Sequence, residues 1–223
     1  MSKMFSLLPQ TRWTATSFWS LEAKSLGVLV FSLAIMGIGE GLLLLSNLGS
    51  SPWTILAQGI ALQGHFSVGW ASFIISILVM LAWIPLRLKV GIGTLLNVFI
   101  IALVLGMTVS LLSAPSALIG RFTFAIVGIL CFGVGSSFYL TCHQGAGPRD
   151  GLMVGLCQHF HLRIGIVRTI LEVSACILGF ILGGTVGIGT LLFAFLIGWI
   201  VQFTVSMINR SPCLLSKIEE PTV

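Results

Sequence analysis

The sequence predicts an all-α membrane protein with six transmembrane helices plus two re-entrant half-helices in an inverted-topology internal repeat. Three observations lead to this prediction. Hydrophobic residues make up 57% of the 223 residues and charged residues only 8%, too few to cover a soluble domain of this size. Six apolar runs can cross the hydrocarbon layer of a bilayer, about 30 Å thick. The chain also matches itself when it is shifted by the distance from Gly49 to Gly145, 96 residues.

The six predicted spanning helices cover residues 26–46, 68–85, 92–113, 121–142, 164–182 and 189–208. Two further segments, 53–64 and 149–161, have helical patterns but are too short. A helix of about 13 residues is only about 20 Å long, because each residue adds about 1.5 Å. We therefore expect neither segment to cross the bilayer alone.

The Lys and Arg residues predict how the two short segments lie. If both segments return to the side from which they enter, both termini and nearly all Lys and Arg residues lie in the cytoplasm, and only Arg121 lies outside. If the short segments crossed, Arg87 and Lys89 would lie outside, against the positive-inside bias. We therefore predict two re-entrant half-helices and cytoplasmic N- and C-termini.

The repeat predicts the domain organisation. "VGIGTLL" at 90–96 recurs at 186–192, and the same shift superimposes several glycines and Pro52 on Pro148. Three spanning helices in each repeat is an odd number, so the repeats must have opposite orientations in the membrane. We predict that the repeated G-I-G-T permits close helix approach. The expected parts are a cytoplasmic arm over 1–25, one transmembrane domain over 26–208, with repeats at about 26–113 and 121–208, and a cytoplasmic tail over 209–223.

Each repeat is broken by a segment rich in glycine and proline, "GSSPWT" at 49–54 and "GAGPRD" at 145–150. Non-helical backbone at membrane depth is stable only where protein buries it or it lines a cavity. Proline suits a first helical turn, and helix N-termini attract anions. The alternative is that both segments are tight turns between packed helices. The favoured interpretation is a substrate-binding site at Gly49, Ser50, Ser51, Pro52, Thr54, Gly145, Gly147, Pro148, Arg149 and Asp150.

Ionisable residues inside the membrane are costly and are therefore candidates for function. Glu40 has no partner in its own helix, whereas Arg168 and Glu172 are one turn apart and could form an internal ion pair. We predict that these three residues are coupling residues or intramembrane charges, with Glu40 or Glu172 available for proton coupling. The alternative for Arg168 and Glu172 is a pair that only neutralises itself. Arg149 is either an anion contact or a topology signal, and Asp150 is either a ligand or a helix cap.

Several functions are excluded by what the sequence lacks. The net charge of +5 is scattered over segment ends, so we expect no nucleic-acid partner. "CQHFH" at 157–161 lacks the paired ligands of a zinc site, so we expect no metal and no cofactor. No nucleophile and base can be paired, so we expect no enzyme.

Asn97 and Gln58 are expected to form hydrogen bonds between helices. The expected partners are a small-molecule or ion substrate and the lipid bilayer, and a homo-oligomer stays open.

Five motifs support a family resemblance: "LGSSPWT" at 48–54, "GIGT" at 91–94, "GAGPRDGLM" at 145–153, Arg168 with Glu172, and "GGTVGIGT" at 183–190. With these motifs the chain resembles the YczE/YyaS/YitT family of bacterial integral membrane proteins over about residues 25–208. The resemblance implies a multi-pass protein of the bacterial inner membrane, presumed to be transport-related, and names no substrate. We predict a secondary transporter or facilitator for a small polar or anionic solute. The alternative is a non-transporting membrane module that assists or regulates a partner protein.

Overall fold

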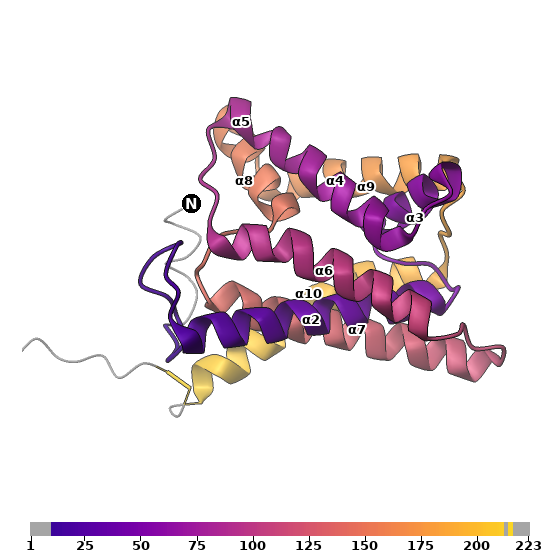
Figure 1. Cartoon of the computed structure of the whole chain (residues 1–223), viewed down its shortest axis with the longest axis horizontal. Coiled ribbons are helices and arrows are strands. Elements are labelled where there is room, and N and C mark those ends of the chain that lie inside the picture. The colour runs from indigo at the N-terminus through magenta and orange to yellow at the C-terminus, as the bar shows by residue number, and fades with distance from the viewer. Residues whose placement is uncertain (1–9, 212–213, 216–223) are drawn as a thin grey trace, which may run out of the picture.

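The computed structural model describes residues 10–211 and 214–215. This part of the chain is helical apart from turns, loops and one isolated β-bridge between Thr11 and Leu215. Figure 1 shows the arrangement. The helices are α2 (Ala23–Leu45), α3 (Pro52–Gly64), α4 (Val68–Leu81), α5 (Trp83–Leu86), α6 (Ile92–Leu111), α7 (Leu118–Thr141), α8 (Pro148–Phe160), α9 (Ile164–Ile181) and α10 (Ile188–Arg210).

Six helices in the described part are long and apolar enough to cross a membrane: α2, α4 continued through α5, α6, α7, α9 and α10. They correspond to the six predicted spans and confirm them as candidates. The boundaries shift most at α2 and α7, which begin at Ala23 and Leu118 rather than at residues 26 and 121. Large apolar side chains such as Ile119, 82% exposed, and Phe195, 74% exposed, point away from the protein. Lipid chains would cover such surfaces.

The centre of the bundle is the contact between α2 and α7, which pack closely over much of their length. Two glycines permit this approach. A Cβ atom on Gly39 would lie 2.6 Å from the carbonyl oxygen of Gly128, and one on Gly128 would lie 2.7 Å from that of Gly39. α6 packs on the other side of α2, α10 packs on α7, and α4 packs on α6.

The two short helices α3 and α8 contain 13 residues each and lie at opposite ends of the bundle (Figure 1). α3 packs mainly against α9 and also contacts α4, whereas α8 contacts α4 and α9. The predicted short segments, 53–64 and 149–161, therefore form helices that are too short to cross a bilayer.

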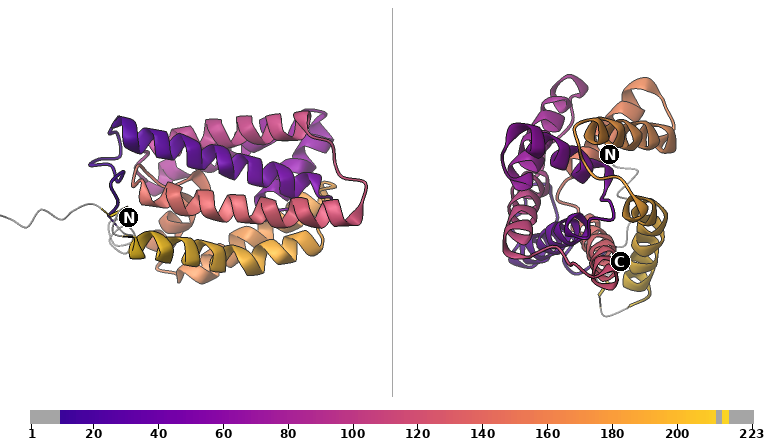
Figure 2. Two further views of the ribbon diagram at one scale, coloured as in Figure 1. Left: turned by 90° about the horizontal axis from the view of Figure 1, so that it is seen from below. Right: turned by 90° about the vertical axis from the view of Figure 1, so that its right-hand side faces the viewer.

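The described part of the N-terminal arm packs against one end of the bundle. Trp13 Nε1 donates a hydrogen bond to Thr141 Oγ1 at 3.0 Å, and Gln144 Nε2 donates one to the carbonyl oxygen of Ser20 at 2.7 Å. The backbone N–H of Arg12 donates to the carbonyl of Leu214 at 3.0 Å. Both ends of the described chain consequently meet at one end of the bundle (Figure 2).

Candidate functional site

The first break leads into α3 through a glycine with a left-handed backbone. Gly49 has φ of +104°, and a Cβ atom there would lie 2.5 Å from Thr190 Oγ1 and from the nitrogen of Gly187. Ser51 then caps α3, since its Oγ accepts a hydrogen bond from the backbone N–H of Thr54 at 3.4 Å. The two side-chain hydroxyls also share a hydrogen bond of 2.8 Å. Pro52 occupies the first turn, as the sequence predicted.

The second break has the same form but different side chains. Gly145 has φ of +117°, and a Cβ atom there would lie 2.8 Å from Thr94 Oγ1. Gly147 is the N-cap of α8 and offers no side-chain hydrogen bond. Side chains of neighbouring helices donate hydrogen bonds to two carbonyl oxygens of this break. Those of Ala146 and Pro148 accept from Thr94 Oγ1 at 2.7 Å and from Trp83 Nε1 at 3.0 Å.

Each G-I-G-T segment forms a backbone hydrogen bond with the residue that precedes the break in the other half of the chain. The backbone N–H of Gly93 donates to the carbonyl of Gln144 at 2.9 Å, and that of Gly189 donates to the carbonyl of Leu48 at 2.6 Å. A Cβ atom on Gly187 would lie 2.5 Å from the same Leu48 oxygen. The glycines do permit close approach, but the partner is a break segment rather than a neighbouring helix.

We expect the hydroxyl of Thr94 to contribute more to the free energy of unfolding than the hydroxyl of Thr190. Thr94→Val should lower the free energy of unfolding by about 2 kcal/mol, because it leaves the buried carbonyl of Ala146 without its donor. Thr190 Oγ1 only accepts from Gly187 N–H at 3.4 Å, so Thr190→Val should cost less than about 1 kcal/mol. Thermal unfolding of both variants in detergent checks this difference. Equal losses would contradict it.

A cavity of about 530 Å³ lies where the two breaks meet the spanning helices. From the breaks it is lined by Ser51, Pro52, Trp53, Gly147, Pro148, Arg149 and Asp150, and from the helices it receives the charged residues Glu40, Arg168 and Glu172. Other polar lining residues are Ser72, Ser76, Asn97, Ser136 and Gln202. The remaining predicted binding residues, Gly49, Ser50, Thr54 and Gly145, are buried and do not line the cavity.

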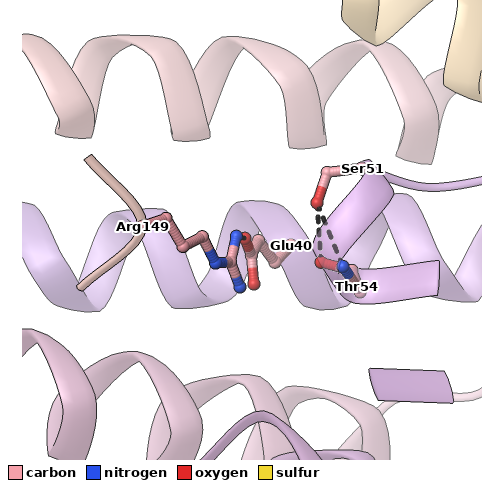
Figure 3. Close-up of polar contacts among 4 residues, drawn as sticks. All are labelled: Glu40, Ser51, Thr54 and Arg149. Atoms are coloured by element: carbon pink, nitrogen blue, oxygen red, sulfur yellow. Dashed lines mark hydrogen bonds and ion pairs between the residues drawn. The ribbon is translucent and has the colours of Figure 1, made fainter. Parts of the chain in front are cut away.

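Glu40 forms an ion pair with Arg149 across the cavity. The distance from Arg149 Nη1 to Glu40 Oε1 is 3.1 Å, and the Glu40 side chain is 1% exposed against 25% for Arg149. Figure 3 shows the guanidinium of Arg149 facing the carboxylate of Glu40, with Ser51 and Thr54 beyond it. The guanidinium carbon also lies 5.4 Å from the centre of the Trp53 ring, a cation–π contact. Glu40 and Arg149 were predicted as site residues, but neither their pairing nor the contact with Trp53 was.

The predicted pair between Arg168 and Glu172 is present in α9. Arg168 Nε donates to Glu172 Oε1 at 2.9 Å. The two side chains are 54% and 36% exposed, and both line the cavity. A charged pair in the first half of an apolar helix therefore lines the cavity.

Asp150 is the carboxylate of the cavity that makes neither a hydrogen bond nor an ion pair within the described part of the chain. It lies in the first turn of α8 but does not cap the helix, because Gly147 occupies that position. Its side chain is exposed on the cavity wall. The charged groups near it are Arg168, Arg149 and Glu172.

Two polar residues expected to bond between helices have different positions. Gln58 in α3 bonds to the loop between α9 and α10 rather than to another helix, so the prediction was wrong about its partner: Nε2 donates to Thr185 Oγ1 at 3.2 Å, and Oε1 accepts from the Thr185 N–H at 2.7 Å. Asn97 instead lines the cavity, where a Cβ atom on Gly147 would lie 3.3 Å from its Nδ2. Asn97 is thus a candidate site residue that sequence analysis assigned to packing.

A second hollow, of about 730 Å³, lies between α7 and α10. Its wall is mainly apolar, with Trp199, Phe203 and Met207 among its lining residues, and none of the described residues that line it is charged. Lipid chains fit such a surface. The charged cavity is therefore the better candidate for a functional site.

Candidate membrane spans arranged around a charged cavity define a multi-pass membrane protein. The chain belongs to a family described as a family of unknown function (DUF6198), whose profile matches residues 23–206.

It is 56% identical over 212 residues to an uncharacterized protein of Haemophilus influenzae, covering 95% of this chain and 97% of that protein. It is 28% identical to the uncharacterized membrane protein YczE of Bacillus subtilis, covering 83% of this chain and 84% of YczE. It is 26% identical to the uncharacterized protein YyaS of the same organism, covering 80% of this chain and 90% of YyaS. The resemblance predicted from the motifs is thereby confirmed. No solved structure matches the chain.

Proposed function

We propose that this protein is a secondary transporter or facilitator that moves a small polar solute across the bacterial inner membrane. The observation that carries this proposal is the cavity in which residues of both breaks meet two ion pairs. Charged groups inside a membrane usually mark the path of a substrate or ion. The sequence also predicted an anionic solute, but Glu40 already engages Arg149, the expected anion contact.

An inverted repeat is part of this proposal, and backbone conformations support it. Within the described residues, every position with positive φ has a counterpart at the repeat shift of 96 residues. Left-handed backbone is uncommon outside glycine, so its recurrence at matching positions is informative. The four pairs are Asn47 with His143, Gly49 with Gly145, His65 with His161, and Arg87 with Gly183.

The cavity lining supports the same relationship. Many lining residues fall into pairs that the repeat shift superimposes, as expected where two related halves meet. Because α3 and α8 are short and lie at opposite ends of the bundle (Figure 1), they suit re-entrant half-helices that enter from opposite faces. The paired lining residues include Glu40 with Ser136, Ser51 with Gly147, Pro52 with Pro148, Trp53 with Arg149, Ser72 with Arg168, and Ser76 with Glu172.

The two halves differ at one helix contact, and this difference favours transport over a static module. α4 packs on α6 through Gly69, where a Cβ atom would lie 2.6 Å from the carbonyl oxygen of Ala102 and 2.9 Å from Gly106 Cα. We call this contact the α4–α6 seam. The repeat shift of 96 residues relates these positions to Gly165 in α9 and to Gly198 and Gln202 in α10. We call the region between these three residues the α9–α10 seam.

The α9–α10 seam is open. A Cβ atom on Gly165 or on Gly198 would meet no atom of the described residues within 4 Å, and α9 stands apart from α10 whereas α4 lies beside α6 (Figure 2). Gly198 and Gln202 line the cavity. Gly69 and Gly165 each follow a short helix, and α3 and α8 lie at opposite ends of the bundle. If the seams exchanged their packing, the cavity would open toward the other end, which is alternating access.

Cross-linking across the open seam tests this proposal. In a background without native cysteines, Gly165→Cys combined with Gln202→Cys should form a disulfide under mild oxidation in vesicles, because the seam closes transiently. Gly165→Cys combined with Trp199→Cys is the matched control, since Trp199 is 73% exposed and lines the second hollow, between α7 and α10. A non-transporting module would keep one packing. Absence of the first disulfide, or equal yields from both pairs, would contradict alternating access.

A further inference from the structure

We infer that the solute carries a positively charged nitrogen group, as in an amine or a guanidinium compound, and that this group binds at Asp150 and Glu40. The inference deepens the proposed function by naming the class of its substrate. It concerns binding, so it can be tested whether or not the protein transports.

The charge balance of the cavity is the first argument. Among the described residues, three carboxylates line it, those of Glu40, Asp150 and Glu172, against two guanidinium groups. Each guanidinium already has a carboxylate partner, at 3.1 Å for Arg149 and at 2.9 Å for Arg168. When all five groups are ionised, one negative charge is left over, on Asp150. An uncompensated charge inside a membrane protein is costly, and a cationic ligand would compensate it.

The hydrogen-bonding capacity of the cavity is the second argument. Glu40 is 1% exposed, and its buried Oε2 has no hydrogen-bond partner among the described residues, although its other oxygen is paired with Arg149. A buried carboxylate oxygen without a donor is rare and costs free energy. Glu40 lines the same cavity as Asp150. Both residues therefore present acceptors that need donors, which an ammonium or guanidinium group supplies.

Side chains of the protein already occupy the first turns of the two short helices. Asp150 lies in the first turn of α8, where a carboxylate is favoured by the partial positive charge of the helix end. Ser51 similarly serves the first turn of α3. The first turn of α8 therefore already holds a carboxylate of the chain. A cavity of about 530 Å³ also lies within the usual size range of small-molecule pockets.

Thermal unfolding of the purified protein in detergent tests the inference. The probes are methylammonium, tetramethylammonium and ethylguanidinium chlorides, compared with sodium acetate, phosphate and sulfate at constant ionic strength and low millimolar concentration. At least one nitrogen cation should raise the unfolding midpoint in a saturable way. Asp150→Asn, which keeps the shape of the side chain, should weaken this response about ten-fold or more, a loss of about 1.4 kcal/mol of binding free energy.

Two variants control this experiment. Glu22→Gln removes an exposed carboxylate outside the cavity and should keep the full response, and Asp150→Glu should restore part of it. Saturable stabilisation by an anion, a response unchanged in Asp150→Asn, or no response to any of the cations would overturn the inference. Cation binding without flux in vesicles would support this inference and contradict transport. Flux of an anion would support transport and contradict this inference.

Discussion

Arg149→Met should lower the free energy of unfolding by about 3 kcal/mol, one of the two largest effects expected of a single substitution in this protein. The substitution keeps much of the aliphatic bulk but leaves Glu40, which is 1% exposed, without its ionic partner. A buried charge that loses its partner costs far more than the pair contributes, because desolvation is no longer compensated. The contact with the Trp53 ring is lost as well. Equilibrium unfolding in mixed micelles measures the loss.

Two further variants separate charge from packing. Adding Glu40→Gln to Arg149→Met should recover most of the lost stability, because the buried carboxylate is then neutral. Arg168→Met is the matched control: Glu172 is 36% exposed on the cavity wall, so it should cost less than about 1 kcal/mol. If the Arg149 and Arg168 variants were equally destabilised, burial of Glu40 would not be the cause.

Gly39→Ala should also destabilise the protein by about 3 kcal/mol. A Cβ atom at this position would lie 2.6 Å from the carbonyl oxygen of Gly128 and 2.7 Å from the backbone nitrogen of Phe132. Both atoms belong to the backbone of α7 and cannot rotate away, so α2 and α7 must separate. The same unfolding measurement applies.

Gly198→Ala is the control for this second effect. The residue also lies inside a candidate spanning helix, but within the described part of the chain a Cβ atom there would meet nothing closer than 4 Å. Alanine favours a helix over glycine by about 1 kcal/mol, so this variant should be neutral or slightly stabilised. A comparable loss in both variants would show that the helix backbone, rather than the contact between α2 and α7, determines the effect.

Sequence alone predicted the parts of the fold that depend on local pattern. Apolar length gives the six candidate spans and shows that the helices after Pro52 and Pro148 are short. The spacing of Arg168 and Glu172 gives their ion pair, because residues four apart share one face of a helix. In each of these cases the interacting residues lie within one segment.

Contacts between distant segments were missed. Glu40 and Arg149 are 109 positions apart, and helical periodicity does not indicate which isolated charges meet across a bundle. Their opposite signs in apolar surroundings were the available signal. The docking of each break on the other G-I-G-T segment was also missed, although both motifs recur at the same shift. Gly49 and Gly145 were assigned to ligand binding, whereas they pack against Thr190 and Thr94.

The folded arm near the N-terminus has a mechanical consequence. It is fastened to the chain that leads from α7 into the second break, through Trp13 on Thr141, the N–H of Ala15 on the carbonyl of Cys142, and Gln144 on Ser20. A displacement of α8 that also moves residues 141–144 would either carry the N-terminal arm along or break these hydrogen bonds, at about 1 kcal/mol for each hydrogen bond. If α8 moves during transport, these hydrogen bonds of the arm would oppose the movement of that wall of the cavity.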